Sequence, residues 1–156
     1  MSAIRFDSLH DYQQQIAQAC TTAQRQILWF DDDLSDTAAD SLELATQLKR
    51  LLVGSSLAKV QILLNDDAWF WRKCPRLQQL LNIYGHAFEL RLSNEIDKGA
   101  GERFLLTEQS VVRIFHSESL RGEASDHAGS RSLCLQRFEA LWLRAEPPSE
   151  GRRLHI

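Results

Sequence analysis

Cysteine is scarce in this chain, and its three cysteines are isolated from one another. Cys20, Cys74 and Cys134 form no C-x-x-C pair, and an odd number cannot all join into disulfides within one chain. Disulfide scaffolds and structural zinc sites both need paired ligands at short spacing. We therefore expect reduced, buried thiols, and we expect no metal or other cofactor.

Long apolar runs and an excess of one charge are also missing. The longest apolar runs are a handful of residues, far short of the ~20 that a membrane-spanning helix needs. Residues 1–12 carry charges and no apolar core, so we expect no signal peptide, no membrane partner and a cytoplasmic location. The net charge is −3, shared as −2 and −1 between residues 1–78 and 79–156. No half is basic, so we do not expect nucleic acid as a partner.

The remaining composition is that of a globular domain. The chain has 156 residues, and 44% of them are apolar, which is enough to bury a real core. Pro147 and Pro148 end the last helical pattern, because proline cannot continue a helix. We expect one domain over residues 1–146 and a flexible C-terminal tail over residues 147–156.

Helical and extended patterns alternate along the chain. Apolar residues at helical spacing alternate with short apolar runs, which predicts parallel strands joined by right-handed crossovers. Two more strands form a hairpin joined at Gln109-Ser110, and a long loop over 117–130 follows. The fold class is therefore α/β: a mixed sheet with parallel crossovers, a C-terminal antiparallel hairpin and helices on both faces. The predicted helices cover 8–23, 36–54, 75–85 and 131–146, and the predicted strands cover 26–30, 59–64, 87–92, 103–107 and 111–116.

The order of these pieces resembles one half of a protein of the phospholipase-D-like family, also called the HKD family. The resemblance runs from about Gln26 to Trp142, and each piece is weak when taken alone. It implies a phospholipase-D-like fold. The matching pieces are Val60–Leu64, Leu77–Leu81, Phe88–Arg91, Arg103–Glu108 and the Phe-x-x-Leu-Trp stretch Phe138–Trp142.

The catalytic motif of that family is not retained. The family carries His-x-Lys, four residues and then Asp, and these positions fall on Gly101, Arg103 and Glu108. In the family, the histidine attacks phosphorus, the lysine neutralises phosphate oxygens and the aspartate orients a histidine. Gly101 has no side chain that could attack anything. The family's Gly-Ser-x-Asn stretch falls on residues 116–119, where only Ser117 matches.

Four residues could still form a residual anion pocket, as the resemblance implies. Arg103 can bind a phosphate or carboxylate through two parallel hydrogen bonds. If Gln109-Ser110 is a two-residue turn, Arg103 lies opposite His116 in the hairpin, and Arg113 lies opposite Leu106. His116 could then be a relocated base or nucleophile, or a hydrogen-bonded histidine at a strand end. The predicted pocket comprises Arg103, Arg113, His116 and Ser117.

Acidic residues follow two predicted strands. Asp31, Asp32 and Asp33 end one strand, and Asp66 and Asp67 end the next. Strand ends of this kind border the ligand crevice of an open parallel sheet, and magnesium binds carboxylate oxygens. Aspartate also caps helices, and each acidic run precedes a helical segment. We favour capping, and a metal held by Asp31 and Asp66 stays open.

An aromatic segment with basic neighbours leaves three interpretations open. Trp69, Phe70 and Trp71 precede Arg72 and Lys73. Tryptophan and arginine are enriched at protein interfaces, aromatic rings can stack nucleic-acid bases, and rings can also cover a sheet edge. The predicted interface residues are the three aromatic side chains.

These observations predict a binding or assembly module without catalytic activity. It would work as a homodimer, since single halves of the family must pair to build a complete site, or beside a separate enzyme. The alternative is a phosphodiesterase or nuclease that uses His116 or a metal at Asp31 and Asp66.

Overall fold

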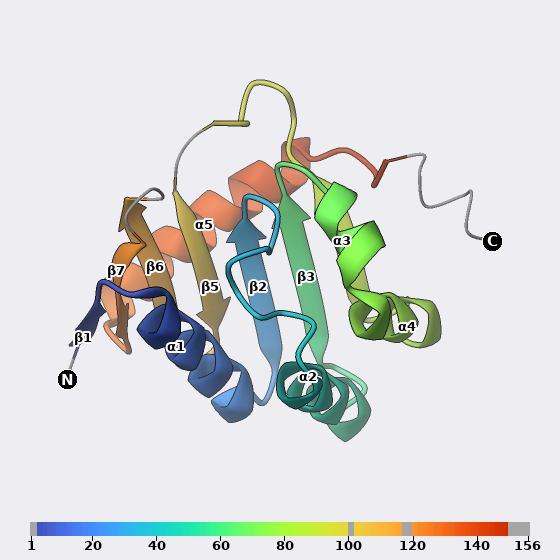
Figure 1. Ribbon diagram of the computed structural model, residues 1–156, viewed down its shortest axis with the longest axis horizontal. Helices are drawn as coiled ribbons and strands as arrows, with labels where there is room; N and C mark the ends of the chain where they lie inside the picture. The colour runs from blue at the N-terminus through green and yellow to red at the C-terminus, as the bar shows by residue number, and fades with distance from the viewer. Residues whose placement is uncertain (1–2, 100–101, 117–119, 150–156) are drawn as a thin grey trace.

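A computed structural model of the chain describes residues 3–99, 102–116 and 120–149, with the backbone alone for His116. Its centre is a seven-stranded mixed sheet of order β1-β7-β6-β5-β2-β3-β4 (Figure 1). The strands are β1 (Ala3–Phe6), β2 (Gln26–Asp31), β3 (Lys59–Leu64), β4 (Phe88–Leu92), β5 (Arg103–Thr107), β6 (Val111–His116) and β7 (Arg121–Ser125). The helices are α1 (Leu9–Thr22), α2 (Leu42–Gly54), α3 (Ala68–Lys73), α4 (Pro75–Ile83) and α5 (Ala128–Arg144).

The parallel part of the sheet is the part that the sequence predicts. Strands β2, β3 and β4 pair in parallel, with Gln26 opposite Lys59 and Val60 opposite Phe88. The helices α2, α3 and α4 make the crossovers. Ser41 caps α2 by accepting a hydrogen bond from Leu44 N. The predicted α/β class with parallel crossovers is confirmed.

The antiparallel part extends further than predicted. Strand β5 pairs with β2 in the middle of the sheet, and β6, β7 and β1 follow it outward. The sequence analysis missed β1, and it assigned β7 to a loop over 117–130. The β7 sequence, Arg-Gly-Glu-Ala-Ser, is polar and carries no strand signal of its own. Its two pairing partners, β6 and β1, hold it in the sheet.

Helices cover both faces of the sheet, as predicted. Figure 1 shows α1 and α2 in front of the sheet and α5 behind it. The front core contains Tyr12, Trp29 and Phe88, whereas the rear core contains Phe30 and Phe138. Successive residues of a strand point to opposite faces, so each strand feeds both cores.

The register of the β5–β6 hairpin differs from the predicted one. The turn is centred on Glu108-Gln109, because Thr107 N donates to Ser110 O at 2.9 Å and Thr107 Oγ1 accepts from Ser110 N at 3.0 Å. Moving the centre of the turn by one residue shifts the β6 partner of each β5 residue by two positions. Arg103 therefore lies opposite Ile114 rather than His116.

The described part of the predicted tail lies against the sheet edge and α3. Glu146 and Leu92 exchange two backbone hydrogen bonds, of 2.7 and 2.8 Å. Ser149 N donates to Asp67 Oδ2 at 2.9 Å. Within the predicted tail, Ser149 thus has a defined contact, and residues 150–156 lie outside the described residues. Among the described residues, no helix combines the length and apolar character that crossing a membrane requires.

Candidate functional site

Arg103, which the resemblance aligns with the lysine of the phospholipase-D-like motif, lies where β5 begins beside the end of β2. Arg103 is the first residue of β5, and Asp31 is the last residue of β2. Because Phe30 pairs with Phe104, the two strands bring these side chains together on the front face. Arg103 Nε donates to Asp31 Oδ1 at 2.8 Å, and the two side chains are 5% and 0% exposed. This is a buried ion pair.

Two further groups surround the Arg103 guanidinium. Asp36 Oδ2 lies 3.4 Å from each terminal nitrogen of Arg103. The Arg103 Cζ atom lies 5.7 Å from the centre of the Tyr12 ring, within the range of a cation–π contact. Tyr12 is itself buried. The guanidinium therefore faces two carboxylates and an aromatic ring, all from this chain.

The buried position of the pair affects all its titrating groups. Burial raises the pKa of Asp31 above its ordinary value, although the Arg103 charge and a 2.7 Å hydrogen bond from Leu34 N oppose that rise. Burial acts to lower the pKa of Arg103, but Asp31, through its charge and its hydrogen bond, acts together with Tyr12 and Asp36 to raise that pKa overall. Burial and the charge of Asp31 raise the pKa of Tyr12, so its phenol stays neutral. The cluster thus pairs the Arg103 guanidinium with carboxylates of the same chain, Asp31 and Asp36.

A strained loop between β2 and α2 carries Asp36 to the cluster. Leu34 and Ala38 have φ values of 73° and 56°, in the left-handed region that residues with side chains rarely adopt. Both the N–H and the hydroxyl of Thr37 donate to Leu34 O, at 3.1 and 2.8 Å. Leu34 and Thr37 are fully buried. These bonds hold the loop against the end of β2.

Glu108, which the resemblance aligns with the aspartate of the motif, has a structural role. It lies just after β5, and its carboxylate accepts backbone hydrogen bonds from Gln24, Arg25 and Gln26 at 2.8, 3.1 and 3.3 Å. Burial would raise the pKa of Glu108, but these hydrogen bonds lower it below its ordinary value. Glu108 thus ties the hairpin to the segment that leads into β2.

Arg113, another residue of the predicted anion pocket, is not brought to Arg103. Arg113 lies opposite Phe104, so it points to the rear face, whereas Arg103 points to the front. The Arg113 Cζ atom lies 5.4 Å from the centre of the Phe115 ring. The His116 side chain and all of Ser117 lie outside the described residues, as does Gly101. The pocket as a whole stays a prediction.

The acidic residues after β2 and β3 make local hydrogen bonds. The two strands are neighbours, as the metal hypothesis required. Asp31 is paired with Arg103, however, and Asp66 Oδ1 accepts a hydrogen bond from Ala68 N at 2.8 Å at the start of α3. In the part of the chain that the structure describes, no group of three or more His, Cys, Asp or Glu side chains is placed to hold a metal ion.

The aromatic segment forms α3, with one ring inside and two at the surface. Phe70 is fully buried in the front core, so it is not available to a partner. Trp69 and Trp71 are partly buried, and Trp71 Nε1 donates to Asp67 Oδ2 at 2.8 Å. An interface that uses the two tryptophans stays a prediction.

The three thiols are free and buried. Burial raises the pKa of Cys20 and of Cys74 to about 12, and that of Cys134 to about 11. A thiol with such a pKa is protonated at neutral pH and is a poor nucleophile or metal ligand.

Tyr12 and Asp36 are the members of the Arg103 cluster that sequence reasoning missed. Tyr12 counted there as one apolar position of a helical stripe, and Asp36 as an acidic residue near a helix start. The available signal was chemical, because an arginine in a buried strand requires an acidic partner. The presence of a buried arginine does not identify which of the many aspartates is its partner.

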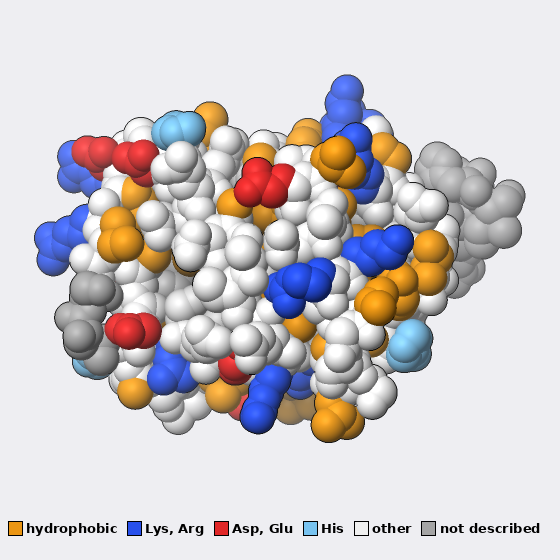
Figure 2. All heavy atoms as spheres, turned by 90° about the horizontal axis from the view of Figure 1, so that it is seen from below, with side chains coloured by type: hydrophobic (Ala, Val, Ile, Leu, Met, Phe, Trp, Pro, Cys, Tyr) orange, Lys and Arg blue, Asp and Glu red, His pale blue; other side chains and the backbone are white. Residues whose placement is uncertain are grey.

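The surface carries no dominant patch of one charge on the side that Figure 2 shows. Charged side chains of both signs are scattered there among hydrophobic and uncharged polar ones. This view looks onto the end of the sheet where β2 and β3 begin, opposite to the Arg103 cluster.

Solved structures with the same fold include an archaeal chromatin protein, the protein NucT and a phospholipase D family member. TrmBL2, described as an archaeal chromatin protein with a novel mode of DNA binding, has a TM-score of 0.70 and 16% identity over 94% of this chain. The match covers 54% of TrmBL2, so this chain spans about half its length.

The other two structures match along nearly their whole length. NucT from Helicobacter pylori has a TM-score of 0.66 and 11% identity, over 94% of this chain and 98% of its own. Nuc from Salmonella typhimurium, described as a phospholipase D family member, has a TM-score of 0.57 and 13% identity, over 95% and 97%. Identities this low show the fold alone. The structural matches establish that the fold of this chain is phospholipase-D-like.

Sequence comparison identifies the family of the chain but indicates no activity for it. No curated protein sequence matches the chain significantly. Residues 8–154 match the family described as "Domain of unknown function (DUF7931)". That match covers most of the chain, which therefore belongs to the DUF7931 family.

Proposed function

We propose that this chain is a phospholipase-D-like domain without phosphodiesterase activity, and that it acts as a binding or assembly module. The observation that carries the proposal is the buried Arg103–Asp31 pair. The cation at the position of the family's lysine is neutralised by the chain itself, and Gly101 supplies no nucleophile.

A substrate phosphate would have to compete with two internal carboxylates for Arg103. The Arg103 side chain is 5% exposed, and removing a buried carboxylate's partner costs ~3–5 kcal/mol. The family's chemistry requires a cation that is open to the substrate, since the phosphate charge must be neutralised in the transition state. Because Asp31 and Asp36 occupy the Arg103 guanidinium, it is not free to neutralise a substrate phosphate, which supports a role without catalysis.

The proposal includes a partner, either a second copy of the chain or a separate enzyme. Oligomeric state is measured directly by light scattering coupled to size exclusion over a range of protein concentrations. A mass of twice 17.9 kDa at micromolar concentration supports the homodimer, and a mass of 17.9 kDa throughout rejects it.

The decisive experiment is a sensitive assay for phosphodiester hydrolysis. We expect bis(p-nitrophenyl) phosphate to turn over no faster than in a protein-free blank, with Mg²⁺ or with a chelator. The active alternatives make distinct predictions. Turnover that disappears in His116→Ala identifies that histidine as a nucleophile or base, whereas turnover that disappears with the chelator identifies a metal. Either result overturns the proposal.

Nucleic acid is a second candidate partner, in contrast to the expectation from net charge. TrmBL2, with the same fold, is described as binding DNA. In this chain two arginines, Arg5 and Arg121, one carboxylate, Asp7, and the half-exposed Phe115 line a hollow of ≈ 460 Å³ at the β1–β7 end of the sheet. Arginines with an exposed aromatic ring can hold a nucleic-acid backbone and stack a base.

The test of this second candidate is the salt dependence of binding. Fluorescence anisotropy of a labelled 20-base single strand would show binding that weakens at least tenfold between 50 and 200 mM salt. Arg121→Glu should abolish it, and the control Arg72→Glu, on α3, should not. Binding that Arg121→Glu leaves unchanged rejects this hollow as the site.

A further inference from the structure

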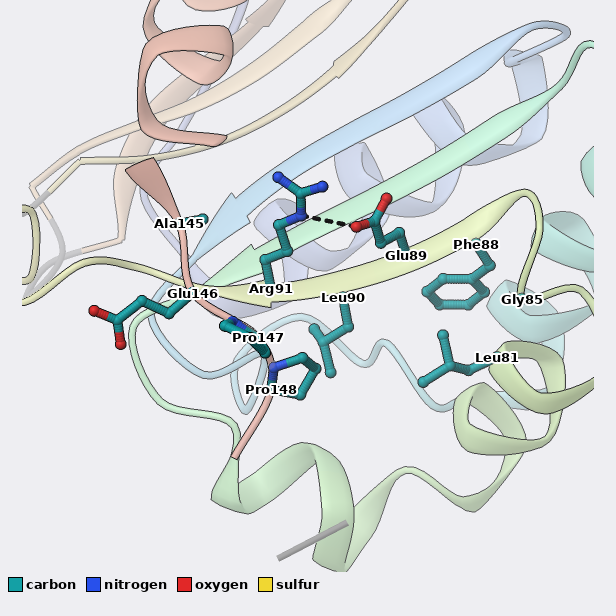
Figure 3. A pocket seen from close by; sticks show the side chains of 10 residues that line it. All are labelled: Leu81, Gly85, Phe88, Glu89, Leu90, Arg91, Ala145, Glu146, Pro147 and Pro148. Atoms are coloured by element: carbon teal, nitrogen blue, oxygen red, sulfur yellow. Dashed lines mark hydrogen bonds and ion pairs between the residues drawn. The ribbon is translucent and has the colours of Figure 1, made fainter. Parts of the chain in front are cut away.

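The two edges of the sheet differ in what covers them. At the β4 edge, Glu146 exchanges two backbone hydrogen bonds with Leu92, and Leu90 is 3% exposed. Figure 3 shows Glu146, Pro147 and Pro148 lying beside β4. Strand β1 forms the other edge (Figure 1), and among the described residues only β7 pairs with it. The outer side of β1 is therefore the open edge of the sheet.

An apolar side chain stands in solvent on this open edge. Ala3, Ile4 and Arg5 are exposed, whereas Phe6 is buried in the front core. Because side chains alternate between the two faces along a strand, Ile4 lies on the same front face as Phe6. Ile4 is 53% exposed. A contact that covered the β1 edge would therefore bury the Ile4 side chain.

The hairpin turn fixes which backbone groups of the antiparallel strands face which neighbour. Thr107 N donates to Ser110 O at 2.9 Å, so these two residues form a hydrogen-bonded pair. Hydrogen-bonded pairs alternate with non-hydrogen-bonded pairs along an antiparallel ladder. The bonded pairs between β5 and β6 therefore include Leu105–Val112. The neighbouring residue Val111 directs its N–H and C=O groups to the other side, toward β7.

The same alternation continues across β7 to β1. As far as Ile114, odd-numbered residues of β6 lie opposite odd-numbered residues of β7, and these are the bonded pairs. The even-numbered residues of β7 therefore bond to β1, and among them Ala124 lies opposite Ile4. Ile4 thus directs its N–H and C=O groups to β7. Ala3 and Arg5 direct theirs away from the sheet, so the open edge presents two N–H and two C=O groups.

This pattern of outward groups is complementary to itself. A two-fold axis normal to the sheet places two identical edges side by side in the antiparallel sense. With the axis at Ile4, Ala3 of one copy lies opposite Arg5 of the second copy, and the reverse pair is equivalent. Both residues of each pair carry outward groups, so every N–H and C=O of the edge gains a hydrogen bond.

Charge selects this register over the neighbouring one. With the axis at Arg5, the two Arg5 side chains would lie directly opposite each other, and like charges in that position are destabilising. With the axis at Ile4, each Arg5 lies between Ala3 of the second copy and Glu123, its own neighbour on β7. The two Ile4 residues then form a non-hydrogen-bonded pair, the kind in which the side chains are closer.

We propose that two copies of the chain pair through β1 in the antiparallel sense, with their Ile4 side chains in contact at a two-fold axis. The inference rests on the part of the proposed function in which the partner is a second copy. The edge specifies that occupant, because its outward groups, its exposed isoleucine and the placement of its arginine all match an identical edge. The sheets of the two copies then form one continuous sheet.

Disulfide cross-linking of the full chain tests the register. Opposed residues have Cβ atoms ≈ 4.5–5.5 Å apart, close to the spacing of a disulfide. Under a mild oxidant, Ile4→Cys should therefore form a covalent dimer on a non-reducing gel. Arg5→Cys, the matched control on the same strand, should cross-link at least tenfold more slowly, because the two copies of that position lie on opposite sides of the axis. The wild type, whose three thiols are buried, should not cross-link.

A charge at the axis tests the contact in solution. Ile4→Arg places like charges opposite each other, and it should raise the dissociation constant of the dimer at least tenfold in light scattering over a dilution series. Ile4 is half-exposed, so the fold should tolerate the change, which circular dichroism checks. Leu57→Arg is the matched control, because Leu57 is 89% exposed in a loop, and its dimer should be as stable as that of the wild type.

Hydrogen exchange of the wild-type chain tests the backbone pairing and needs no variant. The Ala3 and Arg5 amides should exchange at least tenfold more slowly in the dimer than in the diluted monomer. The Ile4 amide, which bonds to β7, should keep its rate. Unchanged Ala3 and Arg5 rates, equal cross-linking of Arg5→Cys and Ile4→Cys, or an Ile4→Arg dimer as stable as the wild type would each overturn the inference.

Failure of this inference is separable from failure of the proposed function. A dimer that none of these β1 measurements affects overturns pairing through β1 and leaves the homodimer standing. A mass of 17.9 kDa at every concentration overturns both. Phosphodiester hydrolysis by the same preparation overturns the non-catalytic role whatever the oligomeric state.

Discussion

The two ends of β5 use their charged residues in different environments. At its start, Arg103 is 5% exposed and pairs with the fully buried Asp31. Just beyond its end, the partly exposed Glu108 accepts three backbone hydrogen bonds. The resemblance described for the sequence predicts that both positions align with charged positions of the phospholipase-D-like motif. In this chain both charges are bound to groups of the chain itself.

The contrast shows that a charged side chain at a position of interest need not be available to a ligand. A charged side chain serves a ligand only when its charge is left unpaired in the free protein. Burial also sets how much each contact stabilises the fold, since an unpaired charge costs far more inside the protein than near water. Substitutions at the two ends should therefore differ in size and in pH dependence.

The largest effect is expected for Arg103→Met. The substitution leaves the Asp31 carboxylate buried without its counter-charge, which should lower the free energy of unfolding by about 3–5 kcal/mol at pH 7. Urea unfolding followed by circular dichroism measures this. The matched control is Arg137→Met, because Arg137 pairs with Glu102 near the surface, where both side chains are more than one third exposed. That loss should be at most about 1 kcal/mol. Equal losses would contradict the assignment of Arg103 as a buried partner.

Lowering the pH should partly rescue Arg103→Met. Burial already raises the pKa of Asp31, and removing Arg103 removes the main opposing charge. A carboxyl whose pKa is raised by folding stabilises the folded state when protonated, and this contribution is lost as pH rises through the folded pKa. The difference in unfolding free energy between wild type and Arg103→Met should therefore shrink from pH 8 to pH 5. Adding Asp31→Asn should remove this pH dependence, and a difference that grows on acidification would refute the argument.

The sequence predicts the parallel half of the fold better than the antiparallel half. The β2 and β3 runs are apolar and bounded by helical patterns, so their period and length identify them. Strands β1 and β7 are short, and β7 is polar, so only their pairing makes them strands. The local sequence pattern of a segment does not show which distant segment will pair with it in the sheet.

The same limit applies to the candidate site. Aligning Arg103 and Glu108 with the family motif identified the two positions. The Arg103–Asp31 contact depends on β5 lying next to β2, and that placement was not predicted. The hairpin register was also wrong by two residues, because Thr107 Oγ1 accepts two hydrogen bonds in the turn and moves its centre. Side-chain hydrogen bonds of this kind are not apparent from hydrophobic spacing.

An intermediate effect is expected for Glu108→Ala. Three backbone N–H groups lose their acceptor, but water can reach this partly exposed site, so the loss should be about 1–2 kcal/mol. Hydrogen bonding lowers the pKa of Glu108, so its contribution is present above the ordinary glutamate pKa and is lost as pH falls through the folded value. The wild-type advantage should therefore shrink in acid, as measured by urea unfolding at pH 7 and at pH 3. An advantage that persists at pH 3 would mean that packing, rather than the carboxylate, stabilises this turn.

The smallest effect is expected for Asp36→Asn. Asp36 is 45% exposed and 3.4 Å from the guanidinium, so its pair with Arg103 resembles a surface salt bridge and should contribute less than about 1 kcal/mol. Asn keeps the shape and one oxygen acceptor, so the loss in urea unfolding should be well below that of Arg103→Met. The result also tests how fully Asp31 neutralises Arg103. If Asp36→Asn created measurable binding of inorganic phosphate, Asp36 would be the group that excludes anions, and Arg103 would retain a ligand-binding capacity that Asp31 alone does not suppress.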